Sequence, residues 1–209
     1  MSLFHQFLQS KSGLKGQVDL LNLATPGATT GGDVVVSQLP IAVAELEARN
    51  RDKTTKNDVK VVTLSAGGYD LFAHILVCLD GPTEDCVNTI NEVRFWSSLA
   101  IDEALNQLGQ AAGPETRIVL VTYSNALTHP DCELHSLAPI WDIALEGDAS
   151  LGVADGLNDV IRSLAASHGA DVAEVSGLLT PTELQSDCFN PNDAGHALIA
   201  QRFAEAFQN

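Results

Sequence analysis

The chain has 209 residues, of which 45% are hydrophobic, and this is enough to form one domain with a buried core. Its 27 acidic and 11 basic side chains give a formal net charge of −16 at pH 7, which repels nucleic acid and anionic membranes. We therefore expect a single domain over residues 1–209, with a solvated acidic surface and no nucleic-acid partner. No apolar run is long enough to predict a transmembrane segment.

Helices and strands are predicted to alternate along the chain. Apolar residues at helical spacing predict that the chain opens in a helix, near Leu3 to Leu8. In chain order there follow a strand at 18–24, a turn-rich loop at 25–33, a helix at 34–48, a strand at 59–65, a helix at 71–79, a long amphipathic helix at 84–111, a strand at 117–123, an irregular stretch at 124–152, a helix at 155–168, a short strand at 171–175 and a closing helix at 192–207.

This alternation predicts the fold class. Strands that alternate with helices form a parallel sheet covered on both faces, which is a three-layer α/β/α architecture. Ligands of such sheets bind beyond the carboxyl ends of the strands. We therefore expect the glycine-rich loops and the segment before the last helix to meet there.

Four cysteines allow two disulfides, in three possible pairings. The short separation between Cys78 and Cys86 favours a disulfide-closed loop, which leaves Cys132 to pair with Cys188. The alternative is four reduced, buried thiols. If the disulfides form, the protein works outside the reducing cytosol, and we expect it to be secreted.

The first candidate for chemistry lies near the C-terminus. Asp193 precedes His196 by three residues at the predicted start of the last helix. A carboxylate at this spacing can orient an imidazole and stabilise its protonated form during proton transfer. Alternatively, Asp193 is a helix N-terminal residue that is favoured by the helix dipole.

Two loops after predicted strands are further candidates. Gly27 follows the strand at 18–24, where a backbone N–H can face a developing oxyanion. Paired glycines, Gly67 and Gly68, precede Tyr69 and Asp70 after the next strand. The structural alternatives are an ordinary strand-to-helix turn for the first loop and a turn that needs positive φ for the second.

In this order, these three segments resemble the sequence blocks of the SGNH/GDSL hydrolases, and the resemblance runs from about Leu3 to Phe207. It implies a flavodoxin-like parallel sheet and the hydrolysis of a small-molecule ester, by an esterase or lipase without a cofactor. It also implies a serine nucleophile from a Gly-Asp-Ser-Leu block. Residues 123–127 and Cys132 resemble features of a secreted bacterial branch.

The family roles carry over by position. His196 becomes the general base, Asp193 its orienting carboxylate and Gly27 an oxyanion donor. Gly68 and Tyr69 lie in the block where the family has Gly-x-Asn-Asp. Tyr69 takes the place of the asparagine, and its hydroxyl would donate from farther out than an amide.

The main departure is that no Gly-Asp-Ser-Leu block occurs in the sequence. We therefore expect the first strand of the fold to be absent. The gap would be compensated by closure between neighbouring strands or by strand exchange in a homodimer. Ser2, Ser65 and Ser124 are poor substitutes for the nucleophile. The alternatives to an active esterase are a catalytically inactive relative that binds a ligand and a truncated form of an active enzyme.

One short segment contains potential metal ligands. His129, Asp131, Cys132 and His135 lie within seven residues. Structural zinc usually takes ligands from two separated segments, so a disulfide-anchored loop is the better interpretation. We expect no metal site.

Overall fold

Across the residues that the structure describes, the sheet has three parallel strands. A computed structural model of the chain describes residues 3–10, 18–51 and 58–208. Within these ranges the strands are β1 (Val61–Leu64), β2 (Arg117–Val121) and β3 (Asp171–Ala173), in the spatial order β1-β2-β3. Val61 lies opposite Arg117, and Val119 lies opposite Asp171.

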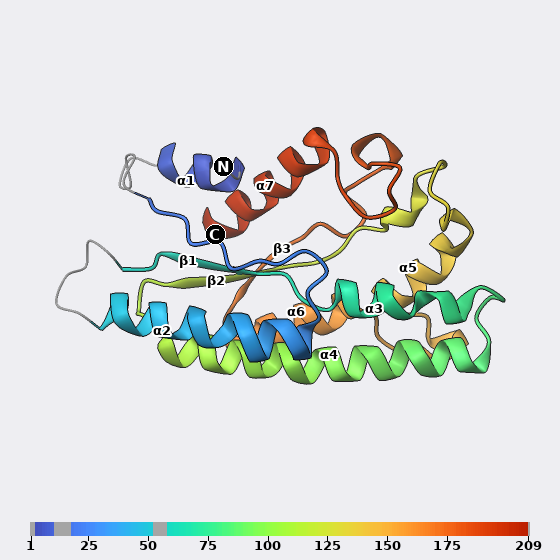
Figure 1. The fold of residues 1–209 in the computed structure, drawn as a ribbon, viewed down its shortest axis with the longest axis horizontal. Helices are drawn as coiled ribbons and strands as arrows, with labels where there is room; N and C mark the ends of the chain where they lie inside the picture. The colour runs from blue at the N-terminus through green and yellow to red at the C-terminus, as the bar shows by residue number, and fades with distance from the viewer. Residues whose placement is uncertain (1–2, 11–17, 52–57, 209) are drawn as a thin grey trace.

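Helices cover both faces of the sheet (Figure 1). One face carries α1 and α7, and the other carries α2, α4 and α6. The seven α-helices of the described ranges are α1 (Leu3–Ser10), α2 (Leu39–Asn50), α3 (Gly68–His74), α4 (Glu84–Ala111), α5 (Ala138–Glu146), α6 (Leu157–His168) and α7 (Asp193–Gln208). The predicted three-layer α/β/α fold is confirmed.

Side chains of β2 alternate between two parts of the core. Val119 and Val121 pack with Ala206 on the face that α7 covers. Leu120 belongs to the larger cluster on the opposite face, together with Leu105 and Ile161 of the covering helices. This period of two is that of a strand buried on both faces, as a central strand of a parallel sheet must be.

Helix α4 begins and ends at the predicted residues. Thr83 caps its start, because the threonine hydroxyl accepts a hydrogen bond from the backbone N–H of Cys86. Glu84 and Asp85 in the first turn are favoured by the helix dipole. Buried residues recur from Cys86 to Ala111; the first part of this face packs against α3 and the segment after it, and Ala104 and Leu108 pack with side chains of the strands.

Two helical segments differ from the prediction. The helix predicted at 34–48 begins earlier, as a π-helical segment at Thr30–Gln38 that continues into α2. The stretch at 124–152 contains α5, where the sequence predicted no helix. The buried residues of α5 follow the helical period, but the helix has only nine residues and carries Pro139 in its first turn, so its signal in the sequence is short.

The strand predicted at residues 18–24 is wrong. This stretch contains no strand, and Leu20 and Leu21 are more than half exposed. Backbone groups of this stretch bond to side chains instead: the imidazole of His5 contacts the carbonyl of Val18, and the amide oxygen of Asn22 accepts from the N–H of Ala24. A strand requires a neighbouring strand, and apolar residues alone do not provide one.

The outer edge of β1 also lacks a partner among the described residues. Strand β1 pairs only with β2 there. The predicted gap is therefore not closed by the stretch at 18–24, which corrects that part of the expectation.

Both disulfides have the predicted pairing. Cys78 is bonded to Cys86 and Cys132 to Cys188. The first closes the connection between α3 and α4, and the second joins the segment before α5 to the segment before α7. None of the described helices is both long and apolar enough to cross a membrane.

Candidate active site

The turn after β1 requires both of its glycines. Gly67 has a φ of +97°, which favours glycine, and a Cβ atom there would lie 2.8 Å from a methyl carbon of Leu157. A Cβ atom at Gly68 would lie 2.5 Å from the ring of Tyr123. The chain therefore passes close to α6 and to the end of β2 before it enters α3. This places Tyr69 in the first turn of α3.

Two of the predicted site residues, Gly27 and Tyr69, are neighbours in space although 42 positions separate them. A Cβ atom at Gly27 would lie 3.5 Å from the Tyr69 ring and 3.8 Å from its hydroxyl oxygen. Gly27 has a φ of +71°, so its turn favours glycine. The phenol of Tyr69 is 43% exposed. The two candidate oxyanion donors thus meet at one place on the surface.

Asp70 fixes the Gly27 turn against α3. Its carboxylate accepts hydrogen bonds from the backbone N–H of Thr30, at 3.0 Å, and from the Thr30 hydroxyl, at 2.6 Å. Thr30 is buried, and Asp33 binds the neighbouring Thr29 through its backbone N–H and its hydroxyl. Asp70, the aspartate of the Gly-Gly-Tyr-Asp block, therefore joins helix α3 to the segment that follows Gly27.

The start of α7 holds the other two predicted residues. Asn192 caps the helix, because its amide oxygen accepts from the N–H groups of Ala194 and Gly195. Gly195 is buried, and a Cβ atom there would lie 2.4 Å from the carbonyl oxygen of Glu183. Because Asn192 provides the cap, the carboxylate of Asp193 is not needed for it.

Asp193 and His196 lie one helical turn apart, and both are exposed. Residues three apart on a helix share one face, which is the arrangement that an aspartate–imidazole pair needs. Within the described parts of the chain, no hydrogen bond joins the two side chains. Nor does a hydrogen bond or ring contact there join His196 to Gly27 or Tyr69.

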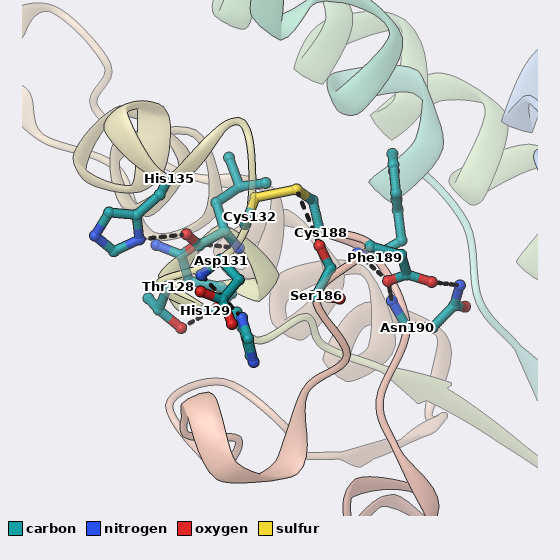
Figure 2. The surroundings of a disulfide bond; sticks show 12 residues. Thr128, His129, Asp131, Cys132, His135, Ser186, Cys188, Phe189 and Asn190 are labelled. Carbon is teal, nitrogen blue, oxygen red and sulfur yellow. Dashed lines mark hydrogen bonds between the residues drawn. A yellow bond between two sulfur atoms is a disulfide. The ribbon is translucent and has the colours of Figure 1, made fainter.

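A disulfide-anchored segment links the start of α7 to α3. Figure 2 shows the bond from Cys132 to Cys188, with Phe189 next along the chain. The ring of Phe189 lies on that of Phe72 in α3, with 3.6 Å between centroids. Asp187 holds this segment by accepting hydrogen bonds from the N–H groups of Phe189 and Asn190. The helix with His196 thus begins a few residues from a contact with the helix that carries Tyr69.

The two alternative serines form structural hydrogen bonds. Ser65 lies 3.0 Å from the phenol oxygen of Tyr123, and burial raises the pKa of that phenol. The partner of Ser65 is therefore a neutral phenol and not a base. Ser124 donates to the carbonyl of Val175 and accepts from the N–H of Leu179, so it joins two loops. Ser2 lies outside the described residues.

Sequence reasoning missed a polar network beyond the ends of β2 and β3. Asn158 of α6 is fully buried; it exchanges hydrogen bonds with the backbone of Tyr123 and donates to Glu146 at 2.6 Å. Arg162, one turn later, pairs with both Glu146 and Glu174. An asparagine and an arginine four residues apart in a helix give no sequence signal, because each is common on exposed faces.

This network lowers the pKa of two carboxyl groups. Partial burial of Glu146 opposes ionisation, but hydrogen bonds from Ser176, Asn158 and Arg162 outweigh it and hold the pKa below its ordinary value. The Arg162 guanidinium is the main cause of the lowered pKa of Glu174, and Thr122 adds a further hydrogen bond. Both groups remain ionised and bonded at neutral pH.

The histidines of the segment at 129–135 form hydrogen bonds with the backbone of their own loop. The ring of His129 accepts from the backbone N–H of Asp131, and the ring of His135 contacts the carbonyl of Leu127. Cys132 is bonded to Cys188. Across the described ranges, no group of three or more ligating side chains is placed to hold a metal ion.

A sequence model of the GDSL-like lipase/acylhydrolase family matches residues 2–198. This chain belongs to that family. Membership places the protein among acylhydrolases.

One solved structure similar to this GDSL-like protein is that of LAE5, an alpha/beta hydrolase enzyme from the metagenome of Lake Arreo, Spain. The two share 18% sequence identity with a TM-score of 0.56, over 99% of this chain and 79% of that one. At this identity the likeness concerns the fold. No curated protein matches the chain.

Proposed function

We propose that this protein hydrolyses short acyl esters at the carboxyl ends of its strands, and that it does so in an extracellular setting. The observation that carries the proposal is the meeting of Gly27 with Tyr69 in a chain of the acylhydrolase family. The two disulfides, formed by all four cysteines, support a location outside the reducing cytosol.

Each proposed residue has one chemical role. The imidazole of His196 accepts a proton from the attacking water and later donates it to the oxygen of the leaving alkoxide. Asp193, one turn earlier, orients the ring and stabilises its protonated form. The backbone N–H of Gly27 and the Tyr69 hydroxyl donate to the oxyanion of the tetrahedral intermediate. Gly68 allows the turn that presents Tyr69.

Because Ser65 and Ser124 already have structural partners, the proposal assigns the attack to neither. The family's nucleophile is the serine of a Gly-Asp-Ser-Leu block, which these 209 residues do not contain. Within this chain, we propose that His196 activates water, which is a slower route.

The test is hydrolysis of p-nitrophenyl butyrate by the 209-residue chain, the His196→Ala variant and the matched His74→Ala variant. His74 is also exposed, and its ring contacts the backbone carbonyl of Asp70. We expect slow hydrolysis that falls at least tenfold in His196→Ala and is unchanged in His74→Ala. Equal rates for all three proteins above background would show that His196 has no catalytic role.

A second candidate is an inactive relative that binds an ester-like ligand at the same place. The observation in its favour is that no described serine is hydrogen-bonded to His196. Hydrolysis at background in all three proteins would favour this candidate and overturn the first.

We further propose that two copies pair through exchanged strands. The outer edge of β1 and the extended stretch at 18–24 both have unpaired backbone groups in the described structure, and such edges pair readily with another chain. The stretch at 18–24 of one copy would lie on β1 of the other. Light scattering after size exclusion should give twice the mass of one chain. The mass of a single chain at micromolar concentration would contradict the pairing.

A further inference from the structure

An exposed apolar stripe begins at the candidate site. Tyr69, Leu76 and Leu79 are 43%, 55% and 61% exposed, and partly buried Phe72 lies between the first two. These residues follow one another at intervals of three or four along α3 and the 3₁₀ segment Ile75–Cys78. Such spacing puts them on one side of the helix. From Tyr69 to Leu79 the stripe is roughly 15–20 Å long.

Phe189 widens the stripe from a different part of the chain. Its ring lies against Phe72 and is itself 44% exposed. The Phe72 ring also lies 6.0 Å, between centroids, from the ring of Trp141, which is buried. Phe72 therefore contacts both the core and Phe189, three positions along α3 from Tyr69.

A disulfide braces each side of the stripe. Cys78, between Leu76 and Leu79, is fully buried in its bond with Cys86. Cys188 holds Phe189 through its bond with Cys132. Contiguous apolar side chains that stay exposed on a folded protein are a mark of a binding surface.

The position and charge of the stripe indicate its occupant. It starts where Gly27 meets Tyr69, so a molecule whose carbonyl reaches these groups can continue along Phe72 toward Leu76. The surface is acidic: Asp80 follows Leu79, Asp187 lies beside Phe189, and the whole chain carries a net charge of −16. Such a surface repels a free carboxylate and accepts an uncharged or zwitterionic molecule.

We propose that this stripe binds the acyl chain of the substrate, and that it selects uncharged or zwitterionic esters with chains long enough to reach Leu76. This inference rests on the proposed function and extends it from short to medium-length acyl chains. Shorter chains contact only Tyr69 and Phe72. Repulsion of the free fatty acid after cleavage favours its release.

Binding can be measured without catalysis. The ligands are n-octylphosphocholine and n-dodecylphosphocholine, which have no acyl ester bond, kept below their micelle concentrations and titrated calorimetrically into the 209-residue chain. On an open surface each added methylene is about half covered, so the dodecyl ligand should bind about tenfold more tightly. Leu76→Ser should weaken dodecyl binding at least threefold.

The matched control is Leu99→Ser. Leu99 is 48% exposed on α4, against 55% for Leu76, and it lies outside the stripe. Its variant should bind both ligands as the unchanged protein does. Equal affinity for the two chain lengths, or equal losses in the two variants, would overturn the proposal. Dodecanoate binding as tightly as dodecylphosphocholine would overturn the choice of a neutral ester. Since no ester is cleaved in this test, failure of the hydrolysis assay is a separate result.

Discussion

The two sides of the sheet are held together in different ways. Beyond β2 and β3, the buried Asn158 joins α6 to the end of β2, and a disulfide ties down the segment before α7. At the other side, β1 has a free outer edge, and the stretch at 18–24 extends without a strand partner in the described structure. We call the region beyond β2 and β3 the closed side and the region beside β1 the open side. Tyr69 follows β1, whereas His196 follows the disulfide-anchored segment, so the candidate site takes residues from both sides.

The largest expected effect comes from removing the disulfide of the closed side. Cys132 and Cys188 are 56 positions apart, against eight for Cys78 and Cys86. Removing a disulfide restores conformational entropy to the unfolded chain, more so for a longer loop. Cys132→Ala with Cys188→Ala should therefore lower the free energy of unfolding by about 4 kcal/mol, and Cys78→Ala with Cys86→Ala by about 2.5 kcal/mol. Urea unfolding of both double variants measures this. A larger cost for the short loop would contradict the comparison.

Asn158→Ala is expected to destabilise the closed side by about 3 kcal/mol, because it leaves backbone groups of Tyr123 without a buried partner and removes one of the hydrogen bonds to Glu146. Asn106→Ala is the matched control, since Asn106 is exposed and bonded only to Asp102 at 3.4 Å. It should change stability by less than about 0.5 kcal/mol. Similar midpoints for the two variants in thermal unfolding would show that the network adds little.

Acid should weaken the closed side next. The pKa values of Glu146 and Glu174 are lower in the folded protein than their ordinary value of 4.5. The unfolded chain therefore takes up protons first, and the stability from these groups is lost as the pH falls below about 4.5. Urea midpoints between about pH 3 and pH 7 should fall in acid, and less steeply for Glu174→Gln. An equal change in slope for Glu103→Gln, an exposed control, would exclude the network as the cause.

The smallest effect is expected at the open side. Leu20→Ala should change monomer stability by less than about 0.5 kcal/mol, because Leu20 is 54% exposed. Leu46→Ala, at a position 2% exposed, should cost about 3 kcal/mol. Chemical unfolding at a protein concentration where only the monomer is present would measure both free energies. A large loss for Leu20→Ala would show that the stretch at 18–24 is already packed.

Local signals in the sequence were sufficient for part of the fold. The amphipathic period at 84–111 predicts α4 with its observed ends, and the pairing of the four cysteines follows from the short separation of Cys78 and Cys86. Helix α5 was missed because it is only nine residues long and has Pro139 in its first turn. The strand at 18–24 was predicted wrongly because composition does not reveal whether a neighbouring strand is available.

Part of the candidate site was also predictable from the sequence, and part was not. Gly27 and Tyr69 were predicted from separate loops, and the structure places them together. The contact between Phe72 and Phe189 joins residues 117 positions apart, and no sequence pattern indicates it. The pairing of Asp193 with His196 remains a prediction.

A double-mutant cycle on that pair tests the central claim most directly. The quantity is kcat/KM for p-nitrophenyl butyrate in the 209-residue chain, Asp193→Asn, His196→Ala and the double variant. If Asp193 acts through His196, Asp193→Asn lowers kcat/KM and the double variant is no slower than His196→Ala alone. Independent losses that multiply in the double variant, or no loss in either single variant, would contradict the account.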